Sequence, residues 1–181
     1  MSRITLIVPS DATGTVEQTF ASIKSAFGVV PNMFKAVANS PAALASMWGS
    51  FGALGGGRLG AKLGEQIAVA IADRNNCSYC LAAHTVLGRK AGASAQDMAD
   101  AQAGHSSDPR AQAALAFALK VVDARADIAA ADVDALRTAG FDDGEVVEII
   151  AHVALNLFTN YVNVALDVPV DFPSVKLTRA A

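Results

Sequence analysis

Two cysteines are the residues of this chain with the clearest capacity for chemistry. Cys77 and Cys80 are the only cysteines among 181 residues, and they stand three positions apart. A reducing compartment disfavours structural disulfides, so a close pair indicates a catalytic, redox-sensing or metal-binding role. Asn75 and Asn76 mark a turn, and the pattern after it predicts a helix over residues 78–90. Cys77 then falls at the helix start and Cys80 one turn in, with both sulfurs on one face and close enough to bond.

The position of the pair at a helix start favours a low thiol pKa. Unpaired backbone N–H groups and the positive end of the helix dipole stabilise a thiolate there, which favours Cys77 as the more acidic thiol. The spacing to His84, four residues after Cys80, favours Cys80 instead. An imidazole one turn deeper on the same face can take the thiol proton and later return it to a leaving group. Of the two cysteines, we expect Cys80 to be the reactive one.

Glu65 is the carboxylate best placed to support that imidazole. Residues 61–73 predict a buried helix, because residues 67–72 are apolar on all sides. If this helix packs antiparallel to the helix of residues 78–90, Glu65 reaches the level of His84. It could then orient the ring and stabilise its charged form. The alternative is that Glu65 is an exposed residue that complements the dipole of its own helix.

The composition narrows the classes of partner. Apolar residues make up 52% of the chain and charged residues 17%, which favours a large core and helix faces covered by other subunits. No Lys/Arg-rich run is present, so no nucleic-acid partner is expected. The apolar runs are too short to span a bilayer, and residues 1–9 lack the long apolar region of a secretory signal. We therefore expect no membrane association and a cytoplasmic location.

Glycine, proline and capping residues divide the chain into helical segments. The predicted helices cover residues 16–27, 31–38, 42–54, 61–73, 78–90, 94–102, 109–124, 131–138 and 142–166, before a proline-containing tail. The only strand-like alternation is in residues 4–8, which have no visible partner strand. The sequence predicts an all-α, single-domain helical bundle. An N-terminal arm of residues 1–40 is expected to pack on a helical domain of residues 41–181.

The order Glu65, Cys77-Ser-Tyr-Cys80, His84 resembles the active-site signature of the AhpD-like alkylhydroperoxidase group within the carboxymuconolactone decarboxylase superfamily. The resemblance is close over residues 61–92 and looser in residues 157–161 and 170–173, where it is to the peroxidase-related branch. It implies an AhpD-like all-helical fold that assembles as a homo-oligomer, commonly a trimer or hexamer.

The resemblance also implies a role for each residue of the signature. Cys80 would attack the peroxide, Cys77 would resolve it into a redox-active disulfide, and His84 would be the base with Glu65 as its partner. This implies an antioxidant thiol-dependent peroxidase or disulfide reductase that acts on alkyl hydroperoxides. A lipoyl protein or a thioredoxin-like protein would supply the reducing dithiol, and no bound cofactor or metal is needed. Some members of the group have a second histidine between the cysteines, where this chain has Tyr79.

Other functions are compatible with the same residues. The pair could act as a redox sensor that changes packing or assembly without turnover. A decarboxylase of the carboxymuconolactone type would keep its activity without the cysteines, which that branch generally lacks. A zinc site would need two further ligands, from among His84, His105 and His152. His105 lies in a polar loop, where we expect it to be solvated.

A polar stripe on the last predicted helix leaves two interpretations open. It consists of His152, Asn156, Asn160 and Asn163. These side chains either form hydrogen bonds at a helix or subunit interface, or some of them line a pocket beside Cys80. The large apolar side chains earlier in the chain are expected in the core or an interface rather than at a substrate platform. They are Phe27, Phe34, Met47 and Trp48.

Overall fold

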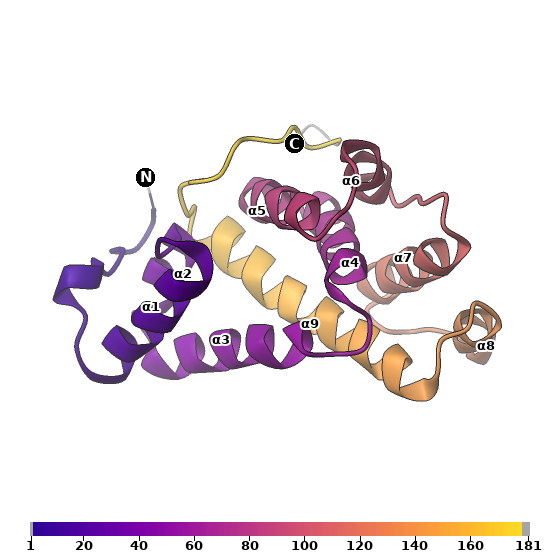
Figure 1. Ribbon diagram of the computed structural model, residues 1–181, viewed down its shortest axis with the longest axis horizontal. Helices are drawn as coiled ribbons and strands as arrows, with labels where there is room; N and C mark the ends of the chain where they lie inside the picture. Colours follow the sequence, from indigo (N-terminus) through magenta and orange to yellow (C-terminus); the bar gives the residue numbers. More distant parts are fainter. Residues whose placement is uncertain (1, 179–181) are drawn as a thin grey trace.

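The predicted helices are present in the structure, a computed structural model that describes residues 2–178 (Figure 1). Residue 1 of the predicted arm and residues 179–181 of the predicted helical domain lie outside the described residues. The described part contains helices and no strand, which confirms the all-α prediction. Its elements are η1 (Pro9–Asp11), α1 (Gly14–Phe27), α2 (Asn32–Val37), α3 (Pro41–Gly55), α4 (Ala61–Arg74), α5 (Ser78–Lys90), α6 (Ala95–Gln102), α7 (Pro109–Asp123), α8 (Ala130–Thr138) and α9 (Asp143–Ala165).

Local sequence signals explain where the helices begin and end. The Ser40 hydroxyl accepts a hydrogen bond from the Ala43 N–H at 3.2 Å, and Pro41 occupies the first position of α3. Gly28 ends α1 in the left-handed conformation, at φ 81°, which a residue with a side chain rarely adopts. At the start of α9, Asp142 and Glu145 form a reciprocal capping box. Together these bonds satisfy helix-end groups that would otherwise lack partners.

Helix α4 is the centre of the bundle. Its residues 67–72 are at most 2% exposed, as expected for a helix that is apolar on all sides. The helix packs against α5, α6, α7 and α9, and Figure 1 shows it between α5 and α7. Because α4 and α5 follow one another around a tight turn, they run antiparallel. This arrangement positions the candidate site residues.

The N-terminal arm packs on the rest of the bundle through α1 and α2. Helix α1 contacts α3, and α2 contacts both α3 and α9. The buried side chains of the arm include Phe20, Ile23 and Phe34. Residues 4–8 are not part of a strand, although the Ile7 N–H donates to the Lys35 carbonyl at 3.0 Å. The arm thus covers one end of α9.

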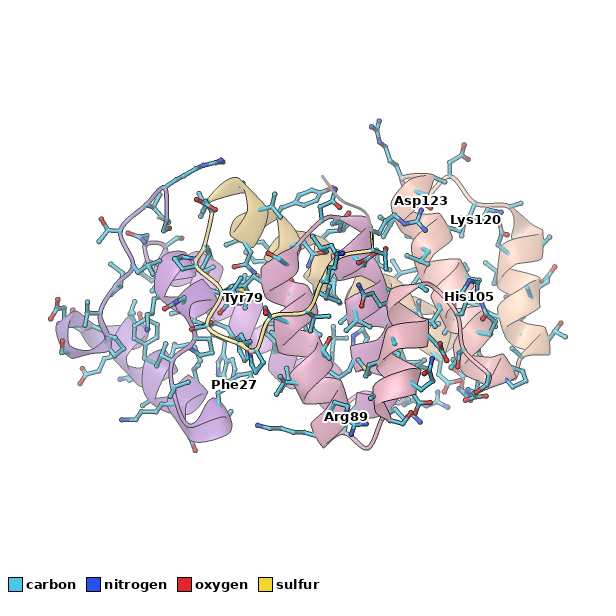
Figure 2. All side chains as sticks on the ribbon, turned by 90° about the horizontal axis from the view of Figure 1, so that it is seen from above. Phe27, Tyr79, Arg89, His105, Lys120 and Asp123 are labelled. Atoms are coloured by element: carbon cyan, nitrogen blue, oxygen red, sulfur yellow. The ribbon has the colours of Figure 1, made fainter. Side chains whose placement is uncertain are left out.

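Hydrogen bonds hold the C-terminal tail to the rest of the molecule at two places. Near its start, the Asp171 carboxylate accepts the N–H of Asn32 at 2.8 Å. Near its end, the N–H of Thr178 donates to Asp73 at 2.9 Å, and the Thr178 hydroxyl also bonds to this buried carboxylate. Gln102 donates to Asp73 at 2.7 Å and to the Lys176 carbonyl at 2.9 Å. Viewed from above, the tail crosses the molecule close to Tyr79 (Figure 2).

Helix α9 has a solvent-facing apolar side. Val147, Ile150, Tyr161 and Val164 are between 41% and 65% exposed along its length. A large exposed apolar stripe on one helix is typical of a surface that another molecule covers. Neither α9 nor another helix within residues 2–178 is long and apolar enough to cross a bilayer.

Candidate active site

The two cysteines lie at the N-terminus of α5, where the sequence places them. Cys77 is the N-cap residue, and its sulfur accepts the N–H of Cys80 at 3.3 Å. Both residues are free thiols, and they are only 1% and 2% exposed. The turn before them includes Asn76 at φ 53°, a conformation that asparagine tolerates better than most residues. The pair is therefore held beneath the surface and is reached only through cavities.

His84 and Glu65 meet across the interface of α5 and α4. The distance from His84 Nδ1 to Glu65 Oε2 is 2.7 Å, and both side chains are largely buried. Gly88 lets the two helices approach here, because a Cβ at this position would lie 2.5 Å from Met98 and 3.3 Å from the Glu65 side chain. The antiparallel arrangement expected for these helices thus brings the predicted carboxylate and imidazole together.

Helix α9 supplies a further group to the cysteines. The Asn163 side-chain amide donates to the Cys80 sulfur at 3.2 Å. Its oxygen, Oδ1, is buried and has no hydrogen-bond partner. The Thr159 hydroxyl is also within hydrogen-bonding reach of Cys80. In one of the two interpretations of the polar stripe, some of its residues lie beside Cys80, and Asn163 does. No pattern in the sequence pointed to Thr159.

These neighbours make Cys80 the acidic thiol of the pair. Burial by itself would raise the pKa of Cys80. The hydrogen bond from Cys77 and the charge of His84 lower the pKa, and the two α9 donors lower it further. The net result is a pKa of about 6, against an ordinary value of 9.0. The surroundings of Cys80 therefore favour its thiolate form.

The same interactions act in the opposite direction on Cys77 and His84. The hydrogen bond to Cys80 and burial both raise the pKa of Cys77, which favours Cys80 as the more acidic thiol. The negative charge of the neighbouring Cys80 sulfur disfavours a second thiolate. Burial lowers the pKa of His84, but the carboxylate of Glu65 and the Cys80 thiolate raise it by more. The arrangement favours an imidazolium between two negative groups.

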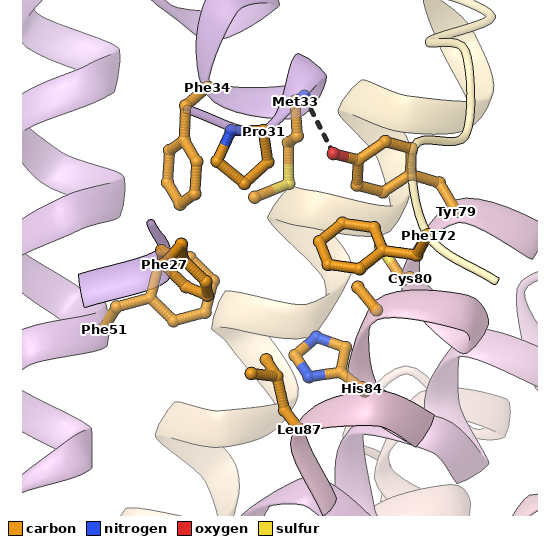
Figure 3. A pocket seen from close by; sticks show the side chains of 11 residues that line it. Phe27, Pro31, Met33, Phe34, Phe51, Tyr79, Cys80, His84, Leu87 and Phe172 are labelled. Atoms are coloured by element: carbon orange, nitrogen blue, oxygen red, sulfur yellow. Dashed lines mark hydrogen bonds between the residues drawn. The ribbon is translucent and has the colours of Figure 1, made fainter. Parts of the chain in front are cut away.

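An apolar pocket opens above Cys80 and His84 (Figure 3). Its cavity volume is about 30 Å³, close to the space of one water molecule. Five aromatic rings from distant parts of the chain are among its eleven lining residues. They are Phe27, Phe34, Phe51, Tyr79 and Phe172. Phe34 lies in the core and Phe27 packs against it, as expected, and both rings also line the pocket.

Tyr79 has a positioning role in this wall. Its hydroxyl oxygen accepts the N–H of Met33 at 3.1 Å, and its ring packs edge-on against Phe172 at 5.7 Å between centroids. Burial is the main reason why the pKa of Tyr79 is raised, so the phenol stays neutral. Tyr79 therefore joins the arm, the cysteine helix and the tail.

A second cavity of about 110 Å³ lies on the far side of the His84–Glu65 pair. It is lined by His84 and Glu65, and by His152 and Asn156 from α9. A Cβ on Gly64 would lie 3.0 Å from the His152 ring, so glycine makes room for the imidazole. Burial is the main cause of a lowered pKa at His152, which favours its neutral form. Two residues of the polar stripe, His152 and Asn156, thus share a cavity with His84 and Glu65.

The other residues suggested by the sequence lie elsewhere. Asn160 accepts a hydrogen bond from Asn75 at 3.0 Å, which joins α9 to the end of α4. His105 is exposed, and Figure 2 shows it far from Tyr79. Within residues 2–178, no three His, Cys, Asp or Glu side chains are grouped so that they could hold a metal ion.

The fold and site together define a class of all-helical proteins with a helix-borne cysteine pair. The carboxymuconolactone decarboxylase family model matches residues 41–124. Residues 41–124, which contain Glu65, the cysteine pair and His84, are therefore similar to that family. The comparison with curated proteins found no match.

Solved structures resemble the whole chain. A peroxidase-related protein from Ralstonia eutropha JMP134, with an alkylhydroperoxidase AhpD core, is 27% identical, with a TM-score of 0.86 over 94% of this chain and 92% of its own. A peroxidase-related protein from Silicibacter sp. TM1040 is 28% identical, with a TM-score of 0.82 over 93% and 91%. The debrominase Bmp8, in complex with 2,3,4-tribromopyrrole, shares the fold at 22% identity, with a TM-score of 0.80 over 94% of each chain.

Proposed function

We propose that the protein is a thiol-dependent peroxidase that reduces organic hydroperoxides. The observation that carries this proposal is the environment of the Cys80 sulfur. It receives hydrogen bonds from Asn163 and Cys77, lies beside the His84–Glu65 pair, and faces an apolar pocket. Such surroundings stabilise a thiolate at neutral pH, and the thiolate is the nucleophilic form of cysteine. The match of residues 41–124 to the carboxymuconolactone decarboxylase family model and the similarity to peroxidase-related solved structures support the same assignment.

The reaction would begin with attack of the Cys80 thiolate on the O–O bond of the hydroperoxide. The sulfur bonds to the outer oxygen, the O–O bond breaks, and the departing alkoxide takes a proton from the His84 imidazolium. The products are an alcohol and the sulfenic acid of Cys80. Glu65 keeps the ring oriented and favours its protonated form before the transfer.

The second half of the cycle would use Cys77. Its thiol loses a proton, its sulfur bonds to the sulfur of Cys80, and the hydroxyl of the sulfenic acid leaves as water. The resulting disulfide accepts two electrons from an external dithiol, which is itself oxidised to a disulfide. A lipoyl or thioredoxin-like protein of the cytoplasm is the proposed donor, and the chemistry requires no bound cofactor.

We further propose that the chain works as a homo-oligomer. The exposed apolar side of α9, defined by Val147, Ile150, Tyr161 and Val164, supports this assignment. The mass in solution, measured by light scattering, is expected to be a multiple of the 18.5 kDa chain, with a trimer or hexamer the favoured states. A monomer at micromolar concentration would contradict it.

Turnover of an organic hydroperoxide with excess dihydrolipoamide tests the function. We expect many equivalents of cumene hydroperoxide to be consumed per protein, and the Cys80→Ser variant to consume none. Consumption of a single equivalent would favour the redox-sensor alternative. Activity toward a lactone or ring acid that survives loss of both cysteines would favour the decarboxylase alternative.

Reductive dehalogenation of a small aromatic ring is a second candidate function. The observation that favours it is the pocket above Cys80, whose wall consists mainly of aromatic and aliphatic side chains. At about 30 Å³ the pocket would have to widen before a flat apolar ring could enter. The debrominase Bmp8 has the same fold. Release of bromide from 2,3,4-tribromopyrrole in the presence of dithiol, with no turnover of hydroperoxide, would favour this candidate.

A further inference from the structure

The two cysteines are reached through different cavities. The apolar pocket of about 30 Å³ is lined by Cys80 and not by Cys77. A separate cleft of about 180 Å³ is lined by Cys77 and not by Cys80. It lies between the start of α5 and the end of α9. Tyr79 lines both cavities.

The two cavities differ in chemistry as well as in size. The wall of the Cys77 cleft includes the polar side chains of Asn76, Ser78 and Asn163, of which the first two are exposed. Asn163 also carries the buried oxygen without a hydrogen-bond partner. A polar cleft with an unused acceptor suits a donor group on an incoming molecule. The apolar pocket has none of these groups in its wall.

The direction of thiol–disulfide exchange follows from the stability of the leaving thiolate. An attacking thiolate bonds to one sulfur of a disulfide and expels the other, and the better-stabilised thiolate leaves faster. Cys80 is the sulfur that receives the Asn163 amide and faces His84. Attack on Cys77 therefore releases a thiolate that is stabilised by the Asn163 amide and the His84 imidazolium. Attack on Cys80 would release the thiolate of Cys77, whose sulfur accepts backbone N–H groups at the helix start but, within the described part of the chain, faces no imidazole.

We propose that the reducing dithiol enters the cleft between α5 and α9 and attacks the sulfur of Cys77, so that oxidant and reductant use separate entrances. This inference rests on the proposed redox function of the pair. The incoming thiolate forms a mixed disulfide with Cys77 and releases Cys80 as a thiolate. The second thiol of the reductant then attacks its own bonded sulfur, expels Cys77, and leaves as an intramolecular disulfide. Two electrons pass to the pair, and one dithiol is oxidised.

A bulky side chain at the cleft tests the separate entrance. Ser78 is the exposed first residue of α5 and lines the cleft. The matched control is Ala95, the exposed first residue of α6, which lines neither cavity. We expect Ser78→Trp to slow reduction of the disulfide by dihydrolipoamide by about tenfold or more, because the thiolate must reach the sulfur. Oxidation of the reduced protein by cumene hydroperoxide should stay at the wild-type rate, and Ala95→Trp should change neither step.

Two results would overturn the proposal. One is reduction of Ser78→Trp at the wild-type rate, and the other is equal slowing of both steps. If Ser78→Trp fails to fold, as judged by its thermal transition, Ser78→Leu places a smaller apolar side chain in the same cleft. Because the disulfide is prepared with diamide, reduction is measured without peroxidase activity. Failure of the peroxidase proposal would instead appear as an absence of cumene hydroperoxide turnover by the wild type.

The attacked sulfur can also be identified directly. Diamide-oxidised protein is mixed briefly with 2-mercaptoethanol, quenched with acid and alkylated. Trypsin then releases both cysteines in the peptide of residues 75–89, which follows Arg74 and ends at Arg89. We expect the mercaptoethanol adduct on Cys77 and the alkyl group on Cys80 in the fragment spectrum. The adduct on Cys80 would overturn the proposal.

Discussion

The side-chain amide of Asn163 donates to the sulfur of Cys80 across 3.2 Å, although the two residues are 83 positions apart in the chain. A hydrogen bond to a sulfur is strongest when the sulfur is charged, so this contact stabilises the thiolate over the thiol. Helix α9 is thus part of the reactive site and not only a support for it.

Removal of this amide should raise the pKa of Cys80. We expect Asn163→Ala to shift it upward by about one unit, because a hydrogen bond to a charged group contributes about 1.5 kcal/mol. The rate of alkylation by iodoacetamide, measured against pH, reports the shift. Asn156→Ala is the control, since the Asn156 amide donates to the His152 carbonyl at 2.9 Å. An unchanged curve for Asn163→Ala would remove Asn163 from the site.

Reactivity of the wild type should have its midpoint near the pKa of Cys80, about 6. The thiolate is the reactive form, so the alkylation rate should fall as the pH drops below that value and level off above it. Mass spectrometry of the same samples should place the first label on Cys80. A midpoint near the ordinary value of 9.0 would show that the surrounding donors have no net effect.

Neutralisation of the carboxylate beside His84 should weaken the proton transfer. Glu65→Gln removes the negative charge that raises the pKa of His84, so we expect the histidine pKa to fall. Peroxidase turnover should fall by roughly tenfold or more, as for loss of acid–base assistance. The imidazole pKa is measured by NMR titration, and circular dichroism checks that the fold is kept. Glu17→Gln, on the exposed side of α1, should behave as the wild type.

Loss of the buried carboxylate under the tail should destabilise the protein. Asp73 accepts hydrogen bonds from Gln102 and from both the N–H and the hydroxyl of Thr178. We expect Asp73→Ala to lower the free energy of unfolding by about 1–3 kcal/mol, because the hydrogen bonds that this buried carboxylate accepts are lost. Urea denaturation measures the change. Thr178→Val, which removes only the hydroxyl, should have a smaller effect, and equal effects would contradict this account.

The helices and the reactive residues could be predicted from sequence because their signals are local. Caps, glycines and prolines mark the ends of each helix, and the pair, the histidine and the glutamate all fall within residues 65–84. Two adjacent antiparallel helices then leave little freedom in how Glu65 meets His84. The superfamily resemblance rests on the same short stretch.

The rest of the site depends on contacts between distant segments. The position of Thr159 beside Cys80 is set by the packing of α9, and no spacing in the chain reports it. Phe27 and Phe172 come from opposite ends of the chain. Nothing in the sequence distinguishes an apolar residue that lines a pocket from one that is packed in the core. Helix position likewise does not reveal which of the two thiols donates to the other, so the sequence offered one reason for each cysteine as the more acidic thiol.

The segments that enclose the pocket have a consequence for how this protein can diversify. The residues that would perform the redox reaction lie between residues 65 and 84, inside the region matched by the family model. Phe27, Met33 and Phe172 lie outside that region, in the arm and the tail. Substitutions in these two peripheral segments can therefore reshape which molecules are admitted while the electron-transfer chemistry is inherited intact. Substrate preference and reactivity are in this sense separately tunable.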